Sequence, residues 1–121
     1  MKKRRLWIGN TKSGEDRVIP INSELFNVMK SMENGRPKPF NFSKWHVMNK
    51  FKKFLKNSGI KGWEMFNVHT LRHTFASHLV MEGTDLYTVS KLLGHSSVAV
   101  TQMYAHLAPD YLKISVKCLK F

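Results

Sequence analysis

Apolar residues recur at helical spacing through most of this chain, and a glycine follows each of the first four helical segments. After the first 21 residues, a segment begins near Ser23 and ends before Gly35. Later segments end at Gly59, Gly83 and Gly94. Glycine readily adopts the left-handed backbone conformation that commonly terminates a helix. This pattern predicts a bundle of short helices joined by tight turns.

The first 21 residues have a different pattern. Two short apolar, β-prone runs, residues 6–8 and 17–21, flank a stretch rich in turn formers that contains Lys12. Such a pair predicts a β-hairpin. Pro20 cannot donate to a ladder, so the second strand is an edge strand or ends there. We therefore expect one domain that is mainly α with a small β-hairpin, with the hairpin in residues 1–21 and a helical bundle in residues 22–121.

The apolar stripes of the expected helices predict the core. Helix starts are expected at Ser23, Ser43, Thr70, Thr84 or Asp85, and Ser96 or Ser97, with a last helix that holds Leu112, Val116 and Leu119. We expect the core to contain Phe75, Leu79, Leu86, Val89 and Leu93. In the second helix, Val47, Met48, Phe51 and Leu55 are expected to face inward, and the lysines between them mostly outward.

Charge indicates the class of partner. The 121 residues include 20 basic and eight acidic ones, a net charge of +12. Such an excess attracts polyanions, so nucleic acid is the leading candidate partner. The alternative is that the basic surface only keeps the protein soluble.

Cys118 is the one cysteine, which is typical of a reducing, cytoplasmic compartment. No apolar run approaches the roughly 20 residues of a membrane-spanning helix, so we expect no membrane contact.

Four polar residues form a candidate phosphate site. His69 and Arg72 lie three apart at the start of a predicted helix, where free backbone N–H groups and the helix dipole also favour an anion. Arg72 can hold a phosphate with two parallel hydrogen bonds. His95 and Tyr104 are nine residues apart, so a turn and a helix can return both to the same face.

These residues belong to three blocks that resemble the signature of the tyrosine recombinase (phage integrase) family in order and spacing. The blocks are His69-x-Leu71-Arg72-His73-Thr74-Phe75-Ala76, Leu92-Leu93-Gly94-His95 and Thr101-x-x-Tyr104. The resemblance extends over the whole chain, because the hairpin with Lys12 looks like the one that bears the family's catalytic lysine. It implies the carboxy-terminal part of the recombinase catalytic domain.

The resemblance also implies roles. Tyr104 attacks the scissile phosphate and forms a 3′-phosphotyrosyl link, and Arg72 stabilises the charge on the phosphate oxygens. Lys12 protonates the leaving 5′-oxygen. His69 assists proton transfer or holds a phosphate oxygen, and His95 hydrogen-bonds the phosphate. No metal and no cofactor are implied. The residues expected to bind DNA are Arg72, Lys12, Lys44, Lys52 and Lys91.

One departure from the family pattern bears on activity. The family has a further catalytic arginine upstream of the hairpin, and this sequence begins at the hairpin. We therefore expect an amino-terminally truncated catalytic domain that is weakly active or inactive alone. The implied partners are double-stranded DNA and further copies of the protein in a synaptic tetramer. The last helix packs either on its own domain or on a neighbouring protomer.

Two readings without chemistry remain open. Residues 76–93, with Gly83 in the turn, also fit a helix-turn-helix in which Ser90, Lys91 and His95 face the major groove. A basic structural or interaction protein explains the charge but leaves the three blocks as coincidence.

His73 points away from Arg72 on the helix and is interpreted as a structural histidine that supports the site.

Overall fold

The computed structural model describes residues 4–9, 16–33, 42–110 and 116. The chain divides into two compact units, Met1–Lys44 and Trp45–Phe121. Each unit is described by itself. No helix within the described ranges is long and apolar enough to cross a membrane.

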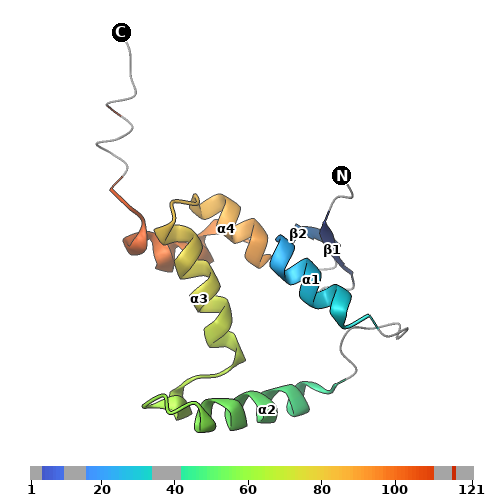
Figure 1. Ribbon diagram of the computed structural model, residues 1–121. Helices are drawn as coiled ribbons and strands as arrows, with labels where there is room; N and C mark the ends of the chain where they lie inside the picture. The colour runs from blue at the N-terminus through green and yellow to red at the C-terminus, as the bar shows by residue number, and fades with distance from the viewer. Residues whose placement is uncertain (1–3, 10–15, 34–41, 111–115, 117–121) are drawn as a thin grey trace. The chain divides into compact units, whose positions relative to one another are not determined.

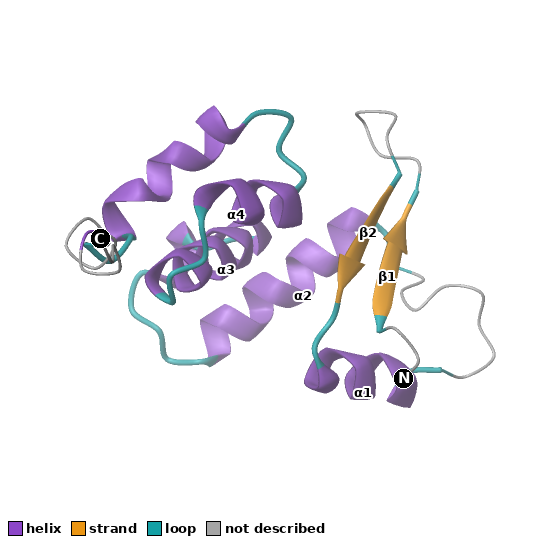
Figure 2. Cartoon of the chain, turned by 90° about the horizontal axis from the view of Figure 1, so that it is seen from above, coloured by secondary structure: helices purple, strands orange, loops and turns teal. Residues whose placement is uncertain are grey.

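The first unit contains the predicted hairpin. Strands β1 (Arg5–Ile8) and β2 (Arg17–Pro20) pair antiparallel, with Arg5 opposite Pro20 and Ile8 opposite Arg17. Figure 2 shows the two strands side by side and running in opposite directions. The second strand ends at Pro20, as its missing N–H predicts. Lys12 and the rest of the turn lie outside the described residues.

Helix α1 (Ser23–Ser31) follows the hairpin directly. Its N-cap is Asn22 rather than the predicted Ser23, and the Asn22 side chain accepts a hydrogen bond of 2.9 Å from the backbone N–H of Leu25. Asparagine is at least as good a cap as serine, so the start moves by one residue. The guanidinium of Arg4 lies 4.9 Å from the ring centre of Phe26. This contact joins the start of the hairpin to the helix. Gly35, the predicted stop, lies outside the described residues.

Helix α2 (Lys44–Asn57) is largely exposed. The five lysines of its sequence face outward as predicted, namely Lys44, Lys50, Lys52, Lys53 and Lys56. Of the side chains expected to face inward, Leu55 is buried and Phe51 is half-buried, whereas Val47 and Met48 are exposed. A short 3₁₀ turn, η1 (Trp63–Met65), separates this helix from the next.

Three elements of the second unit form its core. Helix α3 (Val68–Met81), helix α4 (Leu86–Leu93) and the 3₁₀ helix η2 (Val98–Leu107) pack against one another, and Figure 1 shows them in yellow to orange. The buried cluster between them consists of Ala76, Val80, Val89, Leu93 and Tyr104. Leu79 and Leu86 pack at its margin. The described part of the chain is therefore mainly α with one small hairpin, which confirms the predicted fold class.

The core face of α3 differs from the prediction. Leu71 and Phe75 are 55% and 49% exposed, so the expectation that Phe75 is a core residue is wrong. Ala76 and Val80 are buried instead. Successive residues of an α-helix are rotated by about 100° about its axis, so Ala76 lies on a different face from Phe75. The face with Ala76 and Val80 is the one that packs against α4 and η2.

The ends of α4 follow the sequence signals. Asp85 caps the start and accepts hydrogen bonds from the hydroxyl and the backbone N–H of Thr88, at 2.6 and 2.9 Å. These hydrogen bonds, the one from the hydroxyl first, lower the pKa of the Asp85 carboxyl below its ordinary value. Gly94 ends the helix with φ of +71°, a conformation that favours glycine. Leu112 and Leu119 of the predicted last helix lie outside the described residues.

Candidate active site

The nucleophile candidate lies on a 3₁₀ helix, where an ordinary α-helix was expected. A 3₁₀ helix has three residues per turn, so every third side chain lies on the same face. In η2 this face consists of Val98, Thr101, Tyr104 and Leu107, which are all buried or half-buried. The helix begins after Ser97, as predicted. The three-residue repeat therefore directs both Thr101 and Tyr104 toward α3 and α4.

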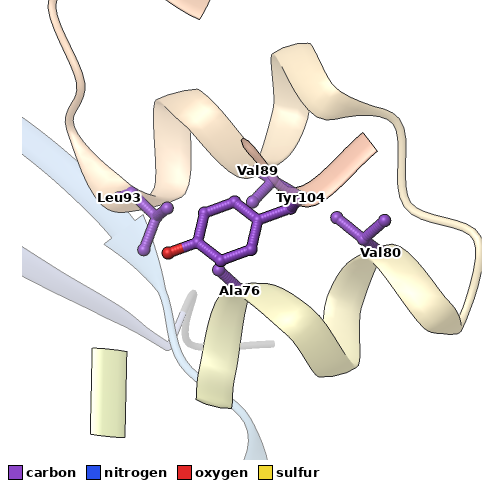
Figure 3. Close-up of a cluster of buried hydrophobic side chains, with 5 residues drawn as sticks. All are labelled: Ala76, Val80, Val89, Leu93 and Tyr104. Carbon is purple, nitrogen blue, oxygen red and sulfur yellow. The ribbon is translucent and has the colours of Figure 1, made fainter. Parts of the chain in front are cut away.

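The ring of Tyr104 is part of the core. Tyr104 is 6% exposed, and Figure 3 shows its ring among Ala76 and Val80 of α3 and Val89 and Leu93 of α4. These apolar neighbours cannot hydrogen-bond the phenol. The orientation of the hydroxyl therefore depends on a polar residue at the margin of the cluster.

That residue is His73. Its Nδ1 lies 2.5 Å from the Tyr104 hydroxyl oxygen, across 31 residues of sequence. His73 shares a face of α3 with Ala76 and Val80, which explains why it reaches the tyrosine. The ring of His69, one turn earlier, meets the His73 ring edge-on, with 5.9 Å between the ring centres. His69, His73 and Tyr104 therefore form a continuous row of side chains.

Arg72 is held at the end of α4. Its Nη2 donates a hydrogen bond of 2.7 Å to the backbone carbonyl oxygen of Leu93. Carbonyls in the last turn of a helix have no partner within that helix, and Leu93 is the last residue before the Gly94 cap. The side chain of the same leucine packs against Tyr104. Leu93 thus links the arginine of the first block to the tyrosine of the third.

His95 follows this cap and is fixed by a second hydrogen bond. Its Nδ1 lies 2.8 Å from the hydroxyl oxygen of Thr101, a fully buried residue of η2. Partial burial, and after it the positive charge of Arg72, lower the pKa of His95 below its ordinary value of 6.5. The neutral form of the His95 imidazole is therefore favoured more than in a free histidine. Because Nδ1 faces Thr101, Nε2 is the ring nitrogen that remains for another hydrogen bond.

The start of α3 is closed by a capping box. The side chain of Asn67 accepts a hydrogen bond of 2.8 Å from the backbone N–H of His69, and the Thr70 hydroxyl accepts one from the N–H of Asn67. We had expected free N–H groups here to bind phosphate. That expectation is wrong for the N–H of His69, because the cap already occupies it.

The predicted site residues are therefore partly assembled. Arg72 and Tyr104 both contact Leu93, His95 lies within reach of the charge of Arg72, and His69 joins Tyr104 through His73. The catalytic lysine candidate, Lys12, lies outside the described residues. Of the lysines expected to bind DNA, Lys44, Lys52 and Lys91 are all exposed. Lys91 also lies 5.3 Å from the ring centre of Tyr87.

Two residues that hold the site together, Thr101 and Asn67, have no role of their own in the sequence-based prediction. His73 is interpreted there as a structural histidine that supports the site, but the sequence does not predict that the partner of His73 is Tyr104. Thr101 was part of a family block without a role of its own. Asn67 is of a residue type that commonly caps helices, and it lies just before the predicted helix, which is the signal that could have found it.

The described groups of the site are of types that suit a phosphate. A guanidinium offers charge and N–H donors, a neutral imidazole offers a hydrogen-bond donor, and a phenol is a candidate nucleophile. Within the described ranges, no group of three or more His, Cys, Asp and Glu side chains lies close enough to hold a metal ion.

The burial of Ser90 argues against the alternative hypothesis that residues 76–93 form a DNA-binding helix-turn-helix. Ser90 was expected to face the major groove, but it is 2% exposed and lies inside the second unit. A buried serine cannot contact a base edge. Lys91 is exposed and keeps access to a polyanion.

Comparison with known proteins shows which family has a similar sequence and fold. Residues 1–110 match the phage integrase family. The chain is 35% identical to the integrase of Escherichia phage 186, over 97% of this chain and 33% of that protein, and 33% identical to tyrosine recombinase XerA of Pyrococcus furiosus, over 93% and 42%. It is similar to the solved catalytic domain of bacteriophage HP1 integrase, with a TM-score of 0.70 and 33% identity over 98% of this chain and 66% of that one. The chain spans about a third of the length of the phage 186 and phage HP1 integrases. With three motif blocks in register, this fold and this match, the chain belongs to the phage integrase family of tyrosine recombinases.

Proposed function

We propose that this protein cuts and rejoins DNA at specific sites, through a covalent link between Tyr104 and a 3′-phosphate. The observation that carries the proposal is that Leu93 contacts both Arg72 and Tyr104, while the charge of Arg72 acts on His95. A DNA-binding module without chemistry needs no such arrangement. Family membership supports the same reaction class, since the relatives are integrases and recombinases.

Each residue has a chemical task in this reaction. Tyr104 attacks the phosphorus atom, and Arg72 stabilises the negative charge that builds on the non-bridging oxygens. His95 donates a hydrogen bond to the same phosphate through Nε2, because Nδ1 faces Thr101. His69 holds a phosphate oxygen or assists proton transfer. Lys12 protonates the leaving 5′-oxygen. The proposed reaction needs no metal, because Arg72 and Lys12 supply the positive charge at the phosphate. It needs no nucleotide cofactor, because the covalent intermediate conserves the energy of the broken bond for rejoining.

The substrate is double-stranded DNA. The net charge of +12 supports binding to phosphates, and the exposed Lys44, Lys52 and Lys91 are proposed contacts beside Arg72 and Lys12. We place residues 1–21 and 22–121 in one catalytic domain. We propose that copies of the protein assemble on DNA as a tetramer, in the cytoplasm.

Covalent capture tests this function. The chain is incubated with a pool of DNA duplexes of randomised sequence, denatured with detergent, and separated on a gel. A 3′-phosphotyrosyl link keeps a 5′-end label on the protein and releases a 3′-end label. We expect a 5′-labelled complex that is lost in Tyr104→Phe. Tyr87→Phe is the matched control, because Tyr87 is an exposed tyrosine of α4. The expected yield is low, because this chain is expected to be weakly active alone. A complex that survives Tyr104→Phe, or one that keeps the 3′-end label instead, contradicts the proposal.

A further inference from the structure

Among the residues that the structure describes, His73 is the polar side chain in contact with the Tyr104 hydroxyl. Its Nδ1 lies 2.5 Å from the phenolic oxygen, and the two rings are tilted by 48° with centres 5.9 Å apart. None of the roles proposed above uses this residue. A phenol is a weak nucleophile at neutral pH and requires a neighbouring base to become reactive.

We propose that His73 is a further catalytic residue, the base that accepts the phenolic proton of Tyr104 during attack on the phosphate. The inference rests on the proposed function, because it needs Tyr104 to be the nucleophile. Histidine suits the task, since a neutral imidazole nitrogen takes up and returns a proton near neutral pH. The contact is made by Nδ1, so the acting tautomer carries its hydrogen on Nε2.

The step balances within the site. As the bond from the Tyr104 oxygen to phosphorus forms, the bond from phosphorus to the leaving 5′-oxygen breaks, and the phenolic proton passes to Nδ1 of His73. The leaving oxygen takes a different proton, from Lys12 in the proposed function. During rejoining the flow reverses, and His73 returns its proton to the tyrosine oxygen.

The surroundings of Tyr104 favour this assignment over a merely structural contact. Val80, Val89 and Leu93 enclose the ring and offer no proton acceptor in their side chains (Figure 3). His73 itself is exposed, so its ring can exchange a proton with solvent after each step. Its other described neighbour is the ring of His69, which approaches edge-on. A core hydrogen bond with no chemical task does not require a solvent-accessible partner.

A small phosphodiester separates this role from DNA recognition. The probe is thymidine 3′-(4-nitrophenyl phosphate), whose 4-nitrophenolate leaves without needing a proton from the protein. Attack by Tyr104 leaves thymidine 3′-phosphate on the tyrosine, detected by protein mass, and releases a coloured product. We expect His73→Ala to slow this reaction by about 100-fold, within the range of a lost general base. The matched control is His78→Ala, because His78 is an exposed histidine of the same helix.

Chemical rescue distinguishes a base from a packing residue. Added imidazole is expected to restore a large part of the rate of His73→Ala, in proportion to its concentration, and to leave His78→Ala unchanged. Helical circular dichroism of both variants checks that they fold. A wild-type rate in His73→Ala, or a slow variant that imidazole does not accelerate, overturns this inference alone. An adduct on a residue other than Tyr104 in the wild-type chain contradicts the proposed function, and this role with it.

Discussion

The guanidinium of Arg72 is anchored to the last carbonyl of α4, with 2.7 Å between its Nη2 and the oxygen of Leu93. One donor is used in this way, and a guanidinium has five N–H groups. The anchor fixes the plane of the arginine beside His95, whose pKa its charge helps to lower. A phosphate group placed at the remaining donors meets an arginine that is already oriented, which is the arrangement that stabilises a transition state most effectively.

A lysine at position 72 keeps the charge but loses the planar fork. We expect Arg72→Lys to reduce the rate of covalent complex formation by about 100-fold, by analogy with the loss of one preorganised donor. The measurement is the labelled protein–DNA complex as a function of time. Arg5→Lys, on an exposed position of β1, is the control and is expected to react like the wild type. A full rate in Arg72→Lys contradicts the role of the fork.

Burial predicts that alanine substitution lowers the free energy of unfolding much more at Leu93 than at Leu71. Leu93 is 4% exposed, so Leu93→Ala is expected to lower the free energy of unfolding by about 2–5 kcal/mol. Leu71 is exposed on α3, and Leu71→Ala is expected to change it by less than about 0.5 kcal/mol. Urea denaturation of the two variants measures both values. Equal losses show that the core face of α3 has been assigned wrongly.

His95 makes stability depend on pH. Its pKa is lower in the folded chain than in the unfolded one, so the unfolded state binds more protons as the pH falls. The contribution of His95 is therefore fully present above its ordinary pKa of 6.5 and is lost as the pH falls through the lower folded value. We expect the melting temperature of the wild type to fall more steeply than that of His95→Asn between about pH 7 and pH 5. Parallel curves for the two proteins contradict this assignment.

The capping box at the start of α3 predicts a stability loss at one asparagine. Asn67→Ala removes the acceptor for the N–H of His69 and is expected to cost about 1 kcal/mol of unfolding free energy. Asn27 lies exposed inside α1, where alanine is a better helix former, so Asn27→Ala is the control and costs nothing. Thermal denaturation measures both. If the two variants melt alike, the cap does not stabilise α3.

Local signals in the sequence predicted where the helices begin and end better than they predicted which side of each helix is buried. Gly94 and Asp85 mark the ends of α4 because a left-handed residue and a capping carboxylate act within one turn. The choice of the Ala76 face of α3 depends on what packs against it, and the 3₁₀ geometry of η2 depends on the same contact. The family blocks located Arg72, His95 and Tyr104. They gave no sign that His73 touches the tyrosine, because that contact joins residues 31 positions apart.

The most direct test of the central claim is the identity of the residue that carries the DNA. The covalent complex is digested with nuclease and protease, and the modified peptide is sequenced by mass spectrometry. The account predicts a nucleotide joined through its 3′-phosphate to Tyr104. A nucleotide on any other residue, or a 5′-phosphate link, contradicts it.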